Sequence, residues 1–361
     1  MLYILFIQRL NLRNASNLRL RIMEGRKLQL AGKSTFLVSL PKRWVTSAGL
    51  KAGDTLFVDT ESDGSVSVRP RSGERPQIRR RIFVEKGEES RDHLLRKLIG
   101  GYVTGFGLIE IRFTPDRGPF VRKVAREFCR LVIGPEVIEE TRNSIVVQDL
   151  SDPTELSSEK CLRRMHLTVR TMLEDAIGAL KTGDQNLAND VDLRGQDVSR
   201  LYWMVAKQYH LAHSAPLPAS DRSTAAVIHG HRLIAKILER IAYHAQRIAG
   251  TFPELGGSKA IDPKMWKDLE EARTSAVVIL DKAFNALVTR DLDGANEAID
   301  RRSEHQRLIE SLQHRVSSRR GEELLALGAV VDSLNRAVVY SAEIAEETID
   351  LAVLTTTQNG G

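Results

Sequence analysis

The sequence predicts a multidomain chain with a small all-β N-terminal domain, an α+β middle domain and an all-α C-terminal region of two tandem three-helix bundles. Three observations support this: short strand-like segments near the start, alternating strands and helices in the middle, and a long helical stretch that repeats itself. Of 361 residues, 42% are hydrophobic and 28% charged. This composition is typical of a globular chain and excludes disordered, collagen-like and fibrous proteins.

The first 22 residues form a loosely patterned stretch before Met23, where a strand-like segment begins. We expect residues 1–23 to be a non-native extension or disordered, with Met23 as the initiator. The apolar start has no preceding basic region and no cleavage site, so no secretory signal is predicted. Apolar runs are short, and no membrane insertion is expected. Cys129 and Cys161 lie far apart, a usage typical of the cytoplasm.

Residues 24–72 are predicted to form the small all-β domain. Asp63-Gly64 between alternating segments is a strong hairpin signal, and Pro41 opens a short helix. So short a domain leaves little room for a core, so we expect a second copy to complete it. The predicted strands are 27–30, 34–40, 55–59 and 65–69, and the predicted helix is 42–48.

Residues 78–150 are predicted to form the α+β domain. Ser90 is placed to cap its first helix, and Arg142-Asn143 is expected to turn a closing hairpin. The predicted strands are 80–85, 108–113, 137–140 and 144–148, and the predicted helices are 90–101 and 119–133.

Residues 155–250 and 262–353 are each predicted to form one three-helix bundle. Apolar residues recur there at helical spacing, and two segments are repeated. Residues 174–184 align with 281–291 at an offset of 107, and residues 238–249 align with 334–345 at an offset of 96. Repetition of whole helices at such a distance indicates a tandem architecture.

Charge is unevenly distributed along the chain. Residues 1–81 carry 16 Lys and Arg against 6 Asp and Glu, whereas residues 82–361 carry 37 against 41. A basic N-terminal part on a mildly acidic body favours binding to a polyanion, most often nucleic acid, through the release of condensed counterions.

Two segments resemble known families. The repeated helical hairpins, of which the first ends in LERIAYHAQRIA at residues 238–249, resemble the PhoU family of phosphate-uptake regulators. Residues 26–58, RKLQLAGKSTFLVSLPKRWVTSAGLKAGDTLFV, are similar to the AbrB/SpoVT/MazE swapped-hairpin DNA-binding domain, in which two chains interleave their strands. The order of these two segments resembles that of archaeal AbrB–PhoU fusion regulators. The segment VDLRGQDVSRLYWMV at 191–205 is part of this resemblance.

The resemblance implies a cytoplasmic transcription regulator of phosphate uptake. Its N-terminal domain would bind operator DNA as a homodimer, and the bundle would relay phosphate status. A two-fold dimer would present each basic side chain twice along the duplex. The expected DNA-contacting residues are Arg26, Lys27, Lys33, Lys42 and Arg43.

The PhoU metal sites are usually built from ExxxD on the closing helix of each repeat, a spacing that puts both acids on one face. This chain keeps Glu239 but has Tyr243 in place of the aspartate, and the second copy has Asn335 and Val339. One acid of four survives, so no cofactor is predicted, although the resemblance would imply a divalent metal or iron.

Other sequence features leave weaker alternatives for a metal site. Acids on the opening helices of the repeats could supply ligands, and histidines flank a proline-rich loop between two predicted helices. Surface or core histidines are the commoner outcome. The acids are Glu174, Asp175 and Asp281, and the histidines are His210, His213, His229 and His231.

Three functional classes compete with the leading prediction. One is a protein–protein adaptor that restrains a phosphate transporter ATPase or its signalling partner, with the N-terminal domain used only to dimerise. Another is an antitoxin of the MazE kind, which the long folded body does not favour. An enzyme is not predicted, since the chain has no nucleophile elbow, HExxH motif or dinucleotide fingerprint.

Overall fold

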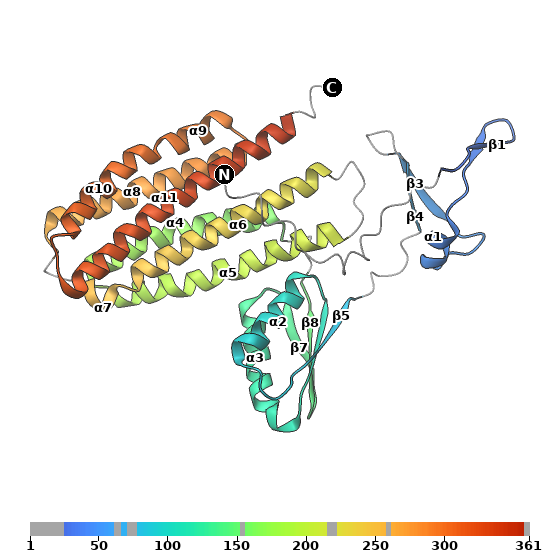
Figure 1. Cartoon of the computed structure of the whole chain (residues 1–361), viewed down its shortest axis with the longest axis horizontal. Helices are drawn as coiled ribbons and strands as arrows, with labels where there is room; N and C mark the ends of the chain where they lie inside the picture. The colour runs from blue at the N-terminus through green and yellow to red at the C-terminus, as the bar shows by residue number, and fades with distance from the viewer. Residues whose placement is uncertain are drawn as a thin grey trace, which may run out of the picture. The chain divides into compact units, whose positions relative to one another are not determined.

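The computed structural model describes residues 25–60, 66–70, 78–151, 156–214, 222–257 and 261–356. Residues 1–24 lie outside these ranges, so the predicted start at Met23 stays a prediction. The chain separates into two compact units. The first holds the N-terminal domain, and the second holds the α+β layer and the helical bundle (Figure 1).

The N-terminal domain contains two strand pairs and a short helix, as the sequence predicts. Strands β1 (Gln29–Ala31) and β2 (Thr35–Leu37) form an antiparallel hairpin. Helix α1 (Lys42–Ser47) follows, and β3 (Leu56–Thr60) pairs with β4 (Val66–Pro70). Among its described side chains none is buried. This domain therefore has no apolar core within one chain.

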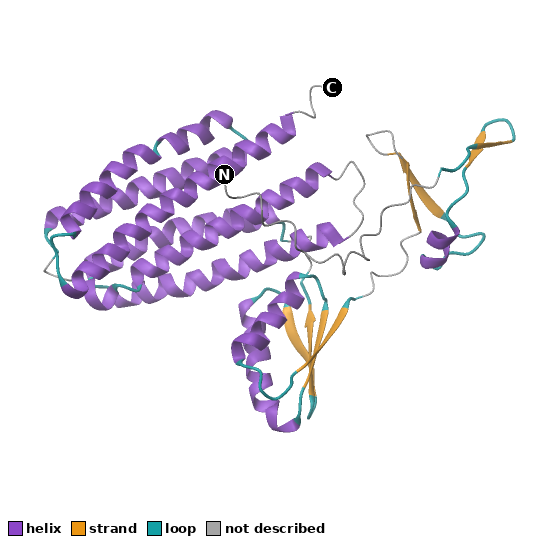
Figure 2. Ribbon diagram, viewed as in Figure 1, coloured by secondary structure: helices purple, strands orange, loops and turns teal. Residues whose placement is uncertain are grey.

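The α+β layer is a sheet covered by two helices on one face (Figure 2). Its strand order is β5-β6-β8-β7, with β5 and β6 parallel and the other pairs antiparallel. Ser90 caps the first helix as predicted, and its hydroxyl accepts from His93 N at 3.3 Å. The elements are β5 (Arg80–Val84), α2 (Arg91–Val103), β6 (Leu108–Arg112), η2 (Pro115–Arg117), α3 (Gly118–Leu131), β7 (Pro135–Glu140) and β8 (Ser144–Asp149).

The bundle consists of two tandem helical repeats, as predicted. The first is α4 (Ser158–Thr182), α5 (Gln185–Ser214) and α6 (Arg222–Ala249), and the short α7 (Phe252–Leu255) follows it. The second is α8 (Pro263–Thr289), α9 (Leu292–Asp300), α10 (Arg302–Val316) and α11 (Gly321–Thr356). The second repeat thus differs from the first, because its middle helix is broken at Arg301.

The two repeats share the same helix ends. Gly183 and Arg290, which the offset of 107 residues makes equivalent, both end their helices in the left-handed conformation, with φ of 74° and 56°. A left-handed residue is a common way to end a helix. The next residues, Asp184 and Asp291, both cap the following helix by accepting backbone N–H groups. Local geometry therefore confirms the repeat.

Helix α11 is long and apolar enough to meet a length and composition criterion for a membrane span over Gly321–Leu354. Half of its most apolar window is buried inside the bundle. Core helices of soluble proteins meet the same criterion, so this single helix is weak evidence for a span, and the predicted absence of membrane insertion stays a prediction.

The α+β layer rests on helix α5 through a buried polar contact. Lys207 of α5 forms an ion pair with Asp149 at the end of β8, and both side chains are buried. The same ammonium donates to Ser151 Oγ at 3.0 Å and lies 4.9 Å from the ring centre of Tyr102. Tyr102 in turn donates to the Ile133 carbonyl at 3.0 Å. Layer and bundle are therefore joined by a desolvated ion pair.

Candidate nucleic-acid interface and bundle cavity

The five predicted DNA-contacting residues are all exposed on the N-terminal domain. Arg26 and Lys27 precede β1, and Lys33 lies in the turn between β1 and β2. Lys42 and Arg43 open helix α1, whose first turn contains no acidic residue. Two cations therefore lie together at the start of this helix.

The N-terminal domain also exposes a set of large apolar side chains. Phe36, which faces Leu30 across the first hairpin, is 63% exposed. A domain this small cannot be stable with its apolar side chains in water, so a partner surface is needed. The exposed apolar residues are Leu28, Leu30, Phe36, Leu37, Val38, Phe57, Val58 and Val66.

The structure places the four ExxxD positions on helices α6 and α11, which pack against each other. The single acid, Glu239, is 18% exposed and accepts from Lys236 Nζ at 2.5 Å. Tyr243 is largely exposed. A hard cation needs several oxygen ligands, and one carboxylate already held by an ammonium does not supply them. The residues at these positions therefore do not fit the metal that the resemblance implies.

The acids on the opening helices are also engaged. Asp281 accepts from Arg170 Nε at 3.0 Å and lies 2.8 Å from His166 Nε2. Asp175 accepts from Arg194 Nη2 at 2.7 Å. Over the described ranges of the chain, no group of three or more His, Cys, Asp or Glu side chains is placed to hold a metal ion.

Three of the four predicted histidines gather around Tyr209. The rings of His210, His213 and His229 lie 5.3, 4.2 and 5.6 Å from its ring centre. His231 is not part of this group, because its Nδ1 lies 2.8 Å from Ser158 Oγ. The structure therefore brings these histidines into an aromatic cluster.

A cavity of about 400 Å³ lies beside Glu239, between α5, α6 and α11. Sequence reasoning missed it because it searched this face for acids. The signal was nevertheless present: Lys236, Arg240 and His244 recur every four residues and so share one face of α6. Its lining includes Lys236, Glu239, Arg240, Tyr243, His244 and Tyr340.

Aromatic rings form one wall of this cavity. The His244 ring lies 5.7 Å from that of Tyr340 and 5.6 Å from that of Tyr243. Burial lowers the pKa of His244, which keeps its ring neutral at neutral pH. His244 and Tyr340 are equivalent at the offset of 96 residues, so the two repeats meet here through matching positions.

Close packing of α5 against α6 holds the cavity wall in place. Gln246 of α6 donates through its amide to the Asp192 carbonyl at 3.0 Å and to its carboxylate at 2.9 Å. A Cβ atom on Gly195 would lie 2.2 Å from Gln246 Cδ. Only glycine at 195 therefore lets this amide cross onto α5.

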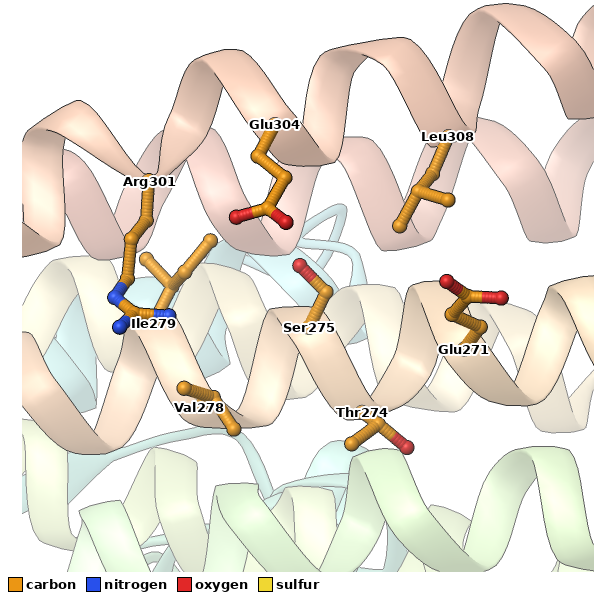
Figure 3. A pocket seen from close by; sticks show the side chains of 8 residues that line it. All are labelled: Glu271, Thr274, Ser275, Val278, Ile279, Arg301, Glu304 and Leu308. Carbon is orange, nitrogen blue, oxygen red and sulfur yellow. The ribbon is translucent and has the colours of Figure 1, made fainter.

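A second cavity of about 340 Å³ lies between α8 and α10 (Figure 3). Glu271 and Ser275 of α8 face Glu304 and Leu308 of α10 across it. Behind it, the fully buried His305 places its Nδ1 3.1 Å from Ser275 Oγ. Burial lowers the pKa of His305 to about 4. This cavity has two acids, Glu271 and Glu304, beside Arg301 in its wall, whereas the first has Lys236 and Arg240 beside Glu239.

Comparison with known proteins agrees with this architecture. Residues 162–251 match the PhoU domain. Residues 29–76 match the family described as antidote-toxin recognition MazE, bacterial antitoxin. One segment of the chain is therefore similar to the PhoU domain and another to the MazE family. No curated protein sequence matches it.

Two solved structures are similar in fold. PhoU from Pseudomonas aeruginosa has a TM-score of 0.51 and 20% identity, and the match covers 55% of this chain and 96% of that one. The phosphate transport system regulatory protein PhoU from Streptococcus pneumoniae has a TM-score of 0.48 and 15% identity over 55% and 94%. The first match extends the PhoU-like fold beyond the matched domain. The resemblance to archaeal regulators stays a prediction.

Proposed function

We propose that this protein is a cytoplasmic, DNA-binding regulator of phosphate uptake and not an enzyme. The MazE-like domain binds operator DNA as a homodimer, and the PhoU-like bundle relays phosphate status to it. The DNA contacts are made by the exposed cations Arg26, Lys27, Lys33, Lys42 and Arg43.

One observation carries the proposal: the N-terminal domain has exposed cations and no buried side chain among its described residues. A second copy supplies the missing core by covering apolar side chains such as Phe36 and Val58. Dimerisation then doubles the number of cations that face one duplex. The need for a second copy thus accounts for both the exposed apolar side chains and the exposed cations of this domain.

The direct test is binding of the purified protein to fragments of its own genome at two salt concentrations. We expect selective binding that weakens with salt, and at least a tenfold loss of affinity in Lys33→Glu/Arg43→Glu. The matched control is Arg302→Glu/Arg307→Glu, which reverses two exposed charges on α10 and leaves binding unchanged. Equal loss in both variants, or unselective binding, contradicts the proposal.

A second candidate function is a protein–protein adaptor that restrains a phosphate transporter ATPase or its signalling partner. The observation that favours it is the independence of the bundle, which forms a compact unit with the α+β layer and without the N-terminal domain. Replacing residues 1–75 with an unrelated dimerising domain separates the candidates. An adaptor keeps its effect on phosphate uptake after this exchange, whereas an operator-binding regulator loses it.

A further inference from the structure

We propose that the cavity between α5, α6 and α11 binds a small organic phosphate that carries a flat ring, the chemistry of a nucleoside monophosphate. The resemblance places a metal ion on this face, and the residues present do not fit one. The proposal concerns the bundle alone and does not depend on DNA binding by the N-terminal domain.

Arg240 supplies the anion-binding group. It lines the cavity, and its guanidinium has no carboxylate partner among the described residues. Two other arginines differ from Arg240 in having a carboxylate partner. Arg247 pairs with Asp332 at 2.6 Å, and Arg336 lies 3.8 Å from the same acid. The Arg240 guanidinium lies 5.6 Å from the Tyr340 ring centre, within the range of a cation–π contact. A guanidinium held in this way can bind a phosphate through two parallel hydrogen bonds.

Two tyrosines supply surfaces for the ring. Tyr243 is 61% exposed although it is a large aromatic side chain on a packed helix, and Tyr340 of α11 is half-buried. Exposed aromatic faces stack nucleobases with little dependence on their sequence. Cation and aromatic groups therefore lie within one cavity, as a ring-bearing phosphate requires.

His244 is a buried residue of the cavity wall with an unpaired ring nitrogen. Its side chain is only 8% exposed, it lines the cavity, and its Nδ1 has no hydrogen-bond partner. Leaving a buried polar atom unpaired is unfavourable by about 1–3 kcal/mol. The Nδ1 atom is closed to solvent, so His244 contributes its ring face beside Tyr340 to the cavity wall.

Size and charge agree with such a ligand. Ligand-binding cavities commonly enclose about 300–1,000 Å³, and this one encloses about 400 Å³. The carboxylate in its wall, that of Glu239, is neutralised by Lys236 at 2.5 Å. The remaining charge of the lining, that of Arg240, is positive.

Isothermal titration of the full-length protein with AMP, adenosine and inorganic phosphate tests the proposal. We expect AMP to bind at least tenfold more tightly than either fragment, with GMP, CMP and UMP included to find the preferred base. Equal affinity for inorganic phosphate means that only an anion is bound, and equal affinity for adenosine means that only the ring is bound. Either result overturns the proposal, as does the absence of binding by all four nucleotides.

Variants then locate the site. Arg240→Ala weakens nucleotide binding about tenfold or more through the loss of a charged hydrogen bond. Tyr243→Ala weakens it about fivefold or more through the loss of stacking. Glu239→Gln leaves the Lys236 ammonium without its carboxylate partner, which adds a positive charge to the lining and tightens binding about twofold or more, a gain that misfolding cannot produce. The control Arg307→Ala lies outside the cavity and leaves affinity unchanged. If Arg240→Ala and Tyr243→Ala both bind normally, the cavity is not the site.

Discussion

The N-terminal domain and the helical bundle expose apolar side chains for different reasons. In the bundle, an exposed residue such as Leu167 lies on a helix whose other face is fully buried. In the N-terminal domain, Phe36 is exposed to the same degree, yet no described side chain of that domain is buried. Equal exposure is thus harmless in one region and indicates a missing partner in the other.

The largest effect is expected where the bundle meets the α+β layer. Lys207→Met leaves the Asp149 carboxylate buried without its counter-charge, which lowers the free energy of unfolding by about 3–5 kcal/mol. Urea denaturation of the full chain measures the change. The double variant Lys207→Met/Asp149→Asn removes the isolated charge and recovers part of the loss. A change below about 1 kcal/mol in the single variant would mean that the pair is hydrated.

The same truncation made in both regions sharpens the comparison. Leu173→Ala opens a cavity in the bundle core and is expected to lower the free energy of unfolding by about 2–5 kcal/mol. Leu30→Ala removes an exposed side chain and is expected to change the stability of the isolated chain by less than about 0.5 kcal/mol. Denaturation at low protein concentration measures both. Equal losses would contradict the absence of a core within one N-terminal domain.

The free energy of unfolding is expected to depend on pH through His305, which is fully buried in the bundle. Its pKa is lowered to about 4, whereas an unfolded histidine titrates near pH 6.5. The unfolded chain therefore binds the proton first, and the free energy of unfolding falls between about pH 6.5 and 4, by roughly 3 kcal/mol in total. Denaturation of wild type and His305→Asn at pH 7, 6, 5 and 4 measures this. Parallel curves would show that His305 does not contribute.

Two matched substitutions to aspartate are expected to change the free energy of unfolding least and to differ most in their effect on dimerisation. Phe36→Asp and Leu167→Asp replace side chains that are 63% and 61% exposed, so each changes the free energy of unfolding of the isolated chain by less than about 0.5 kcal/mol. Only Phe36→Asp is expected to convert a dimer into monomers, since a charge in the shared core is strongly unfavourable. Sedimentation equilibrium distinguishes them. Dissociation caused by Leu167→Asp alone would place the dimer contact on the bundle.

Most elements of the fold could be predicted from the sequence, because local signals agree with the packing. Asp184 and Asp291 cap equivalent helices, and Ser90 caps α2 as expected. The break at Arg301 could not be predicted, since its equivalent Arg194 lies inside the continuous helix α5. The two arginines have different neighbours, Leu193 and Gly195 in the first repeat and Asp300 and Arg302 in the second.

The candidate site was predicted less completely than the fold. The basic residues of the N-terminal domain are exposed as expected, while their role in DNA binding stays a proposal. The loss of the ExxxD acids was visible in the sequence, but the cavity that lies there was not. Tyr340 reaches it from α11, and only the packing of α11 on α6 brings His244 and Tyr340 together.

Contact with the α+β layer distinguishes helix α5 from its counterparts in the second repeat. Helix α5 packs on both neighbours in its own repeat and on α2 and α3, whereas its counterparts α9 and α10 pack on α8, α11 and each other. The copy with the extra neighbour is one continuous helix, and the copy without it is bent into two. Helix α5 and the pair α9 and α10 thus differ in both shape and neighbours, while the two repeats still match at the capped helix ends and where His244 meets Tyr340.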